Sequence, residues 1–246
     1  MKYLAALLLL LLAALTLRAD VFLFYGGDFD PNNGNANGLA NENDALIGGD
    51  PYGAATYQSA VNTGQAGPSD YIPYWIVGGL FTNNLSSLNP SSAYWEIRTG
   101  MSEGNGGTLI ASGTATGDGF SHTPTGRSGF GYTEYSDTVS FASVWLEPGT
   151  YWFAVVPNDP NSGGRSFNSN TFGLNAVGTQ VIDEQFWNSA YFGANFTNAN
   201  NEGVFHTFSS GVIGSYFIPE PSSLVMLGSG LLGVAATLRR KLAGRS

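Results

Sequence analysis

Residues 138–156 read TVSFASVWLEPGTYWFAVV and contain the strongest indication of the fold in this 246-residue chain. Every position in 151–156 is apolar, which is typical of a strand buried on both faces. Residues 147–150, Glu-Pro-Gly-Thr, place Pro and Gly where a type II turn needs them. The stretch therefore predicts a β-hairpin whose second strand lies in the centre of a sandwich.

Apolar and aromatic runs of similar length recur on both sides of this hairpin, and the residues between them are turn formers: Gly, Asn, Pro, Ser and Asp. We expect strands at residues 21–25, 54–61, 74–81, 93–98, 108–111, 138–146, 150–156, 204–208 and 212–217. Within 93–98, Ala93, Trp95 and Ile97 alternate with polar residues, which predicts one buried face and one wet face. No part of this body has a sustained 3.6-residue stripe. Residues 20–218 therefore predict an all-β domain, an antiparallel two-sheet sandwich of jelly-roll character.

Charged residues are few and unevenly placed. The chain has 9 basic and 18 acidic residues, and most of the basic residues lie near the termini. Between Asp20 and Ile218, three arginines face 17 acidic residues, a net charge of −14. Nucleic-acid binding needs Lys and Arg to neutralise phosphates, so we expect no nucleic-acid partner. The absence of cysteine excludes disulfides, thiolate metal sites and cysteine nucleophiles.

The amino terminus has the layout of a secretory signal peptide. Residues 1–3 are a short basic start, residues 4–15 are almost wholly Leu and Ala, and Ala19 offers a small residue before a cut. We expect residues 1–19 to form a signal-peptide helix that is removed on export. The alternative is an uncleaved membrane anchor.

The carboxyl terminus has three parts in order. Pro219, Glu220 and Pro221 come first, an apolar span at 224–238 follows, and a basic cluster closes the chain at 239–245. The span is shorter than the ~20 residues that usually cross a bilayer. The cluster holds Arg239, Arg240 and Lys241, which should stop on the cytoplasmic side. We expect a short transmembrane helix here, and an ordinary anchor helix is the alternative.

This order of parts over residues 217–246 resembles the PEP-CTERM sorting signal of bacteria. The resemblance implies that Pro219, Glu220 and Pro221 are recognised by an exosortase, a membrane-embedded protease-transpeptidase, so residues 219–246 would be its substrate. It also implies transit through the inner membrane, then a cell-surface or extracellular location. Residues 95–108 and 146–152 are similar to the β-sandwich bodies that accompany such tails.

Catalytic groups are hard to find in the body. Its two histidines, His122 and His206, lie beside Thr and Ser, outside any nucleophile motif, and solvated polar side chains are the simpler interpretation. Glycosidases need two carboxylates across the sugar. Glu96 and Glu134 are the candidates on or near expected strands, but nothing in the sequence brings them together. We therefore expect no enzymatic activity.

The Asp/Asn-rich loop at residues 28–35 is the candidate metal site. Asp28, Asp30 and Asn32 offer oxygen ligands of the kind that calcium prefers, although the spacing departs from the EF-hand pattern. A solvated turn-rich loop is the alternative. No other cofactor is expected.

Aromatic residues give the remaining hint of function. Tyr and Trp side chains can stack on sugar rings, and several fall in or beside expected loops. They are Tyr25, Tyr52, Tyr57, Tyr71, Tyr74, Trp75 and Trp187. The sequence thus favours an exported surface or matrix protein with a structural or glycan-binding role and extracellular polysaccharide as a partner. The alternative is a secreted hydrolase acting on that polysaccharide.

Overall fold

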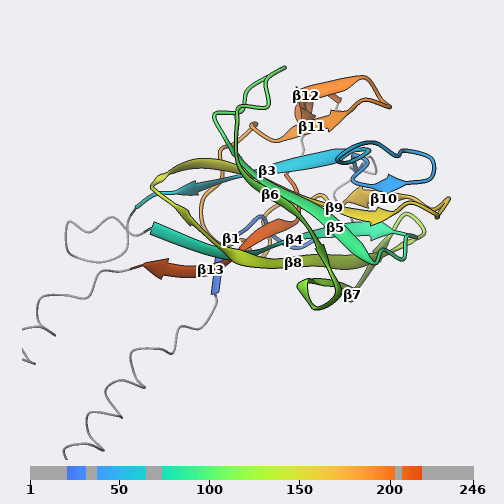
Figure 1. Ribbon diagram of the computed structural model, residues 1–246, viewed down its shortest axis with the longest axis horizontal. Helices are drawn as coiled ribbons and strands as arrows, with labels where there is room; N and C mark the ends of the chain where they lie inside the picture. Colours follow the sequence, from blue (N-terminus) through green and yellow to red (C-terminus); the bar gives the residue numbers. More distant parts are fainter. Residues whose placement is uncertain (1–20, 32–37, 65–73, 203–206, 218–246) are drawn as a thin grey trace, which may run out of the picture.

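The computed structural model describes residues 21–31, 38–64, 74–202 and 207–217, which form two antiparallel sheets packed face to face (Figure 1). The prediction of an all-β, two-sheet sandwich is confirmed, and the described residues contain no α-helix. Accordingly, no helix among them is long and apolar enough to cross a membrane. The predicted signal-peptide helix and the predicted span at 224–238 lie outside the described residues.

The first sheet has six strands. Its path is β1-β13-β4-β8-β7, and β10 pairs with the end of β4. The strands are β1 (Val21–Tyr25), β4 (Tyr74–Ser86), β7 (Phe120–Gly129), β8 (Tyr132–Leu146), β10 (Ser166–Asn168) and β13 (Ser210–Phe217). Because β1 is antiparallel to β13, the first and last strands of the described chain lie side by side.

The second sheet has seven strands. Its path is β12-β11-β3-β9-β5-β6, with the short β2 paired to β9 in parallel. The strands are β2 (Asn43–Asp44), β3 (Ala55–Asn62), β5 (Ser92–Thr99), β6 (Thr108–Thr116), β9 (Gly149–Asp159), β11 (Phe186–Ser189) and β12 (Ala194–Asn198). Two 3-10 turns, η1 (Gly117–Gly119) and η2 (Ala199–Glu202), complete the elements.

The predicted hairpin at 138–156 is wrong in its pairing, although both strands exist. β8 pairs with β4 and β7 in one sheet, whereas β9 pairs with β3 and β5 in the other. The turn at 147–149 thus carries the chain across the core, and Gly149 already belongs to β9 with a φ outside the left-handed region. Pro148 and Gly149 allow the chain to reverse direction, but they do not determine whether the two flanking strands pair with each other.

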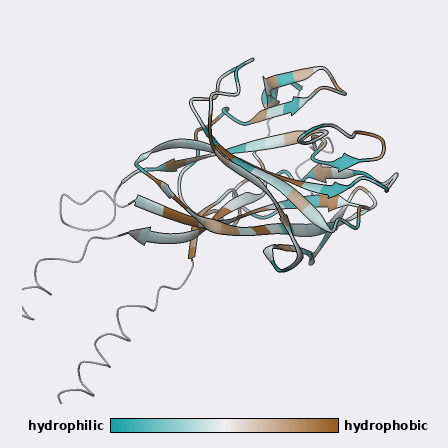
Figure 2. Ribbon diagram, viewed as in Figure 1, coloured by the Kyte–Doolittle hydropathy of each residue, from teal (hydrophilic) through white to brown (hydrophobic). Residues whose placement is uncertain are grey.

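The main core fills the space between the sheets, where apolar residues of both layers meet (brown in Figure 2). Trp95 of β5 and Phe141 of β8 stack across it with ring centroids 3.8 Å apart. Ala93, Trp95 and Ile97 all point into this core, so the predicted buried face of residues 93–98 is confirmed.

The predicted wet face of the same strand is wrong. Tyr94, Glu96 and Arg98 lie on the outer face of the seven-stranded sheet, and Glu96 is fully buried. The β11–β12 hairpin covers this face: Phe196 packs against Tyr57, with ring centroids 5.7 Å apart. A second apolar cluster forms beneath it, made of Ala55, Tyr57, Met101, Trp152, Ala154, Val156 and Phe186.

Sequence reasoning missed five strands, the two-residue β2 and the strands β7, β10, β11 and β12, which are rich in Ser, Asn, Thr or Gly. β7 contains Pro124, which an edge strand tolerates because one side of its backbone is unpaired. The expected strand at 204–208 is not seen in its described part, where Phe208 makes only an isolated bridge to Asn170.

Candidate functional site

The chain enters and leaves the sandwich at one end, which we call the tail-proximal end. Val21 at the start of β1 lies opposite Gly214, and Phe217 at the end of β13 lies opposite Tyr74 at the start of β4. The end of β8 joins them, since Leu146 pairs with Trp75. Val21 and Phe217, the first and last described residues, therefore lie toward the same end of the sandwich (Figure 1).

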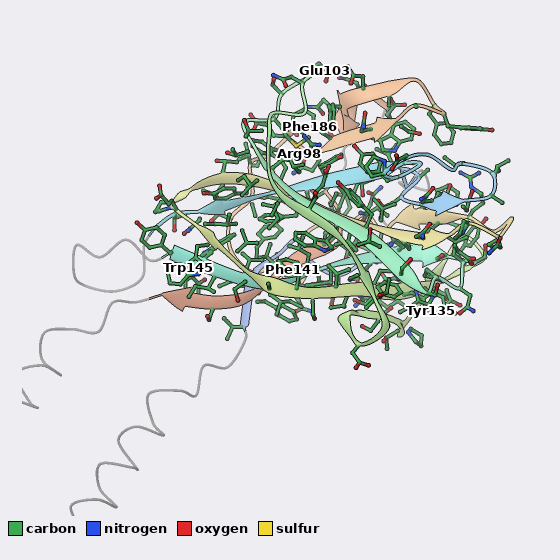
Figure 3. All side chains as sticks on the ribbon, viewed as in Figure 1. Arg98, Glu103, Tyr135, Phe141, Trp145 and Phe186 are labelled. Carbon is green, nitrogen blue, oxygen red and sulfur yellow. The ribbon has the colours of Figure 1, made fainter. Side chains whose placement is uncertain are left out.

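Large apolar side chains are exposed at this end. Trp145 is 55% exposed, and Tyr216 lies partly open beside a small pocket of about 70 Å³ that Trp75 also lines. Phe22, which is 52% exposed, lies further along the same sheet against Phe81. Figure 3 shows Trp145 at the end of the sandwich where β4 begins. The ring of Trp145 lies 6.4 Å from that of Tyr74.

Of the predicted calcium ligands, only Asp28 and Asp30 lie in the described residues. Asp28 is already occupied: Tyr25 donates to Oδ1 at 2.7 Å, Arg127 lies 3.0 Å from the same oxygen, and Asn175 donates to Oδ2 at 2.7 Å. Burial opposes ionisation of Asp28, but these hydrogen bonds and the charge of Arg127 outweigh it and lower its pKa. Among the described residues, no three acidic or histidine side chains lie close enough to hold a metal ion.

The two candidate carboxylates of a glycosidase lie in different sheets, Glu96 in β5 and Glu134 in β8, and both are fully buried. Each is neutralised by its own arginine: Arg98 Nε lies 2.7 Å from Glu96, and Arg127 Nε lies 2.5 Å from Glu134. The structure does not bring them to a common cleft.

Around Glu96 the structure assembles a group that we call the tyrosine–arginine cluster: Tyr52, Tyr57, Tyr94, Glu96 and Arg98. Tyr57 and Tyr94 donate hydrogen bonds to the Glu96 carboxylate, the latter at 3.0 Å. Arg98 donates to the same carboxylate from Nε and from a terminal nitrogen. Burial raises the pKa of Tyr57 well above its ordinary value, and the negative charge of Glu96 adds to that rise.

Part of this cluster reaches the surface. The rings of Tyr52 and Tyr94 are half-buried and 5.4 Å apart. Asn188 of β11 donates to the Tyr52 hydroxyl at 2.8 Å, and Arg98 lies over the Phe196 ring. The alternation Tyr94-x-Glu96-x-Arg98 was visible in the sequence as one face of a strand, but Tyr52 and Asn188 come from distant loops and strands.

Other aromatic candidates are mostly structural. Tyr25, Tyr57, Trp75 and Trp187 are buried, and Tyr71 lies outside the described residues. Of the six candidates that the structure describes, only Tyr52 and Tyr74 are half-exposed.

The interpretation of His122 as a solvated side chain is wrong, while His206 lies outside the described residues. His122 is 11% exposed, its Nδ1 lies 2.6 Å from buried Asp137, and its ring stacks on Tyr135. Asn84 holds the other Asp137 oxygen at 2.7 Å and in turn accepts from Asn41, which also donates to the β9 backbone. No hydroxyl of the described residues hydrogen-bonds to His122, so this polar chain links the two sheets without presenting a nucleophile.

Comparison with known families adds the last element. Residues 217–241 match the model of the PEP-CTERM protein-sorting motif. The protein is therefore an exported protein whose tail is sorted through exosortase, the membrane enzyme that recognises such tails. Pro219, Glu220, Pro221, Arg239, Arg240 and Lys241 all fall within the matched residues, outside the described part of the chain. No match was found among curated proteins or among solved structures.

Proposed function

We propose that this protein is a non-enzymatic component of the cell surface or the extracellular polysaccharide, and that its seven-stranded sheet binds glycan. The observation that carries the proposal is the half-buried tyrosine pair, Tyr52 and Tyr94, whose rings lie 5.4 Å apart. The Asn188 amide holds Tyr52 in place by donating to its hydroxyl while it accepts from the backbone of Phe196. Aromatic faces stack on the apolar faces of sugar rings, while amides and hydroxyls bond to sugar hydroxyls.

The net negative charge of the body indicates which kind of polysaccharide it can bind. A net charge of −14 between Asp20 and Ile218 disfavours anionic glycans. The arginine nearest the tyrosine pair, Arg98, is already engaged by Glu96 and by the carbonyl of Gly106. The expected ligand is therefore a neutral polysaccharide.

Affinity electrophoresis tests this binding. The exported chain is run in gels containing dextran, xylan or hydroxyethylcellulose, with alginate as the anionic comparison. We expect retardation by at least one neutral polymer and its loss in Tyr94→Ala. The matched control is Phe172→Ala, which removes an exposed ring from a distant loop. Equal retardation of both variants, or none of the wild type, contradicts the proposal.

The rival function is a hydrolase, and the two arginine-paired carboxylates argue against it. A general acid must reach the glycosidic oxygen, whereas Glu96 and Glu134 are fully buried in separate sheets. Release of reducing sugar from the same polymers, abolished by Glu96→Gln in a folded variant, would establish the hydrolase instead.

The tail is proposed to be removed during sorting. A short span that contains Gly228, Gly230 and Gly233 makes a weak helix and suits temporary residence better than permanent anchorage. The mature surface form should lack the residues beyond about Pro221, as measured by intact mass in the native host. Replacing residues 219–221 by three alanines should leave export intact and retain the full-length chain in the inner membrane. Wild-type protein that still carries Arg239 to Ser246 contradicts this.

A further inference from the structure

We propose that the tail-proximal end of the sandwich docks on the lipid headgroups of the membrane while the sorting tail is still attached. The docking surface, which we call the aromatic rim, consists of Tyr74, Trp145 and Tyr216, which lie where β4 begins and where β8 and β13 end. The inference rests on residence of the tail in the membrane, and it adds a role for the body that the sorting motif does not supply.

The chain between the body and the membrane-inserted span is short. Phe217 ends β13 and the apolar span begins at Leu224, seven residues later. At no more than ~3.6 Å per residue, the connection reaches at most ~25 Å. The rim therefore stays within a few nanometres of the bilayer surface for as long as the tail is inserted.

The distribution of charge on the body also favours this end. The strand segments 21–25, 74–82, 138–146 and 210–217 meet at this end, and none of them contains a charged residue. Elsewhere the body is strongly acidic, and an anionic leaflet repels acidic groups. Asp20, directly before β1, and Glu147, directly after β8, are the acidic residues that adjoin these segments at this end. These uncharged strand segments are thus the part of the body that can approach lipid at least cost.

The exposed side chains at this end have the chemistry of a headgroup-binding surface. Trp145 projects from the outer face of the six-stranded sheet, opposite to Leu146, which points into the core. Tyr74 lies next to it on the neighbouring strand. Trp and Tyr are enriched where proteins meet the headgroup layer because their rings are apolar and each carries a polar group. An exposed group of rings beside a membrane-entering tail therefore fits a lipid surface.

The experiment uses the absence of cysteine, which lets one fluorophore be placed at will. Ser143→Cys puts a label on the same side of β8 as Trp145, two residues away. Asn161→Cys puts the control label in the exposed β9–β10 turn, at the opposite end of the sandwich. The exported chain with its tail is reconstituted into phosphatidylcholine vesicles that contain a headgroup-region nitroxide lipid, and only vesicles recovered by flotation are measured.

We expect several-fold stronger lipid quenching of the label at 143 than of the label at 161. Adding Tyr74→Ser and Trp145→Ser should reduce quenching at 143 to the level at 161, while far-UV circular dichroism stays unchanged. A chain that does not float refutes membrane insertion of the tail, and the docking with it. A chain that floats with equal quenching of both labels refutes the docking alone. Blue-shifted emission at 143 without lipid quenching means that a protein covers the rim, which overturns the lipid assignment.

Discussion

Two tryptophans on either side of one turn have opposite surroundings. Trp145 lies next to the end of β8 and Trp152 lies near the start of β9, and both point away from the space between the sheets. Trp152 is 4% exposed and Trp145 is 55% exposed. The difference arises because the β11–β12 hairpin covers the outer face of the seven-stranded sheet, where Trp152 packs against Phe186. The alternation of side chains along a strand determines which face of the sheet each side chain points to. Whether that face is buried depends on segments that are distant in the sequence.

The largest effect should come from truncating the covered tryptophan. Trp152→Ala removes a buried ring and its hydrogen bond to the Glu184 carbonyl, and it should cost about 3–5 kcal/mol of unfolding free energy. Trp145→Ala should change it by no more than about 0.5 kcal/mol. Urea unfolding followed by far-UV circular dichroism measures both. Similar losses for the two variants would mean that the outer faces do not differ.

The same comparison sets the limit of sequence reasoning. The two-sheet architecture and the buried inner face of β5 could be predicted because turn residues and alternating side chains are local features of the sequence. The outer face of β5 did not, because residues 186–198 fold back over it from about 90 positions further along the chain. Because the covering segment is distant in the sequence, the strand pattern predicted a solvent-exposed Glu96. Nothing in the sequence indicated that Tyr52 and Tyr57 lie beside Glu96. The tail was predictable because a sorting signal is a linear order of residues.

A second effect concerns the segment at 38–54, which also helps cover the seven-stranded sheet. Glu42 fastens it to the β9–β10 connection by accepting from Arg165 at 2.8 Å and from the backbone of Ser166. Burial raises the pKa of Glu42 to about 7, although Ser166 and Arg165 oppose the rise. The folded protein therefore holds this proton at pH values where the unfolded chain has released it.

Protonated Glu42 should contribute fully to the free energy of unfolding below about pH 4.5. This contribution should be lost as the pH rises through 7, and the free energy of unfolding should fall by up to about 3 kcal/mol. Burial raises the pKa of Asp137 in the same direction, so wild type alone is not diagnostic. The measurement is the difference in unfolding free energy between wild type and Glu42→Gln at pH 5, 6 and 7. A difference that does not change with pH excludes Glu42 as the titrating group.

A smaller difference in stability is expected between removing a buried and a half-exposed tyrosine hydroxyl on the outer face of the seven-stranded sheet. Tyr57→Phe withdraws a donor from the buried Glu96 carboxylate and should cost about 1–2 kcal/mol. Tyr94→Phe withdraws a donor that water can replace, so it should cost less. Thermal unfolding at pH 7 compares the pair. A larger loss for Tyr94→Phe would show that water does not reach this edge of the cluster.

The smallest effect is expected for calcium at the Asp28 loop, beside the six-stranded sheet. A ligand that binds only the folded state raises the melting temperature by mass action. Both Asp28 oxygens already accept from Tyr25, Asn175 and Arg127, and a calcium ion would have to displace the arginine cation. We therefore expect no measurable shift between millimolar calcium and chelator. A rise in melting temperature that disappears in an Asp28→Asn/Asp30→Asn double variant would show that calcium outcompetes Arg127. A rise that persists in that variant would place the ion elsewhere.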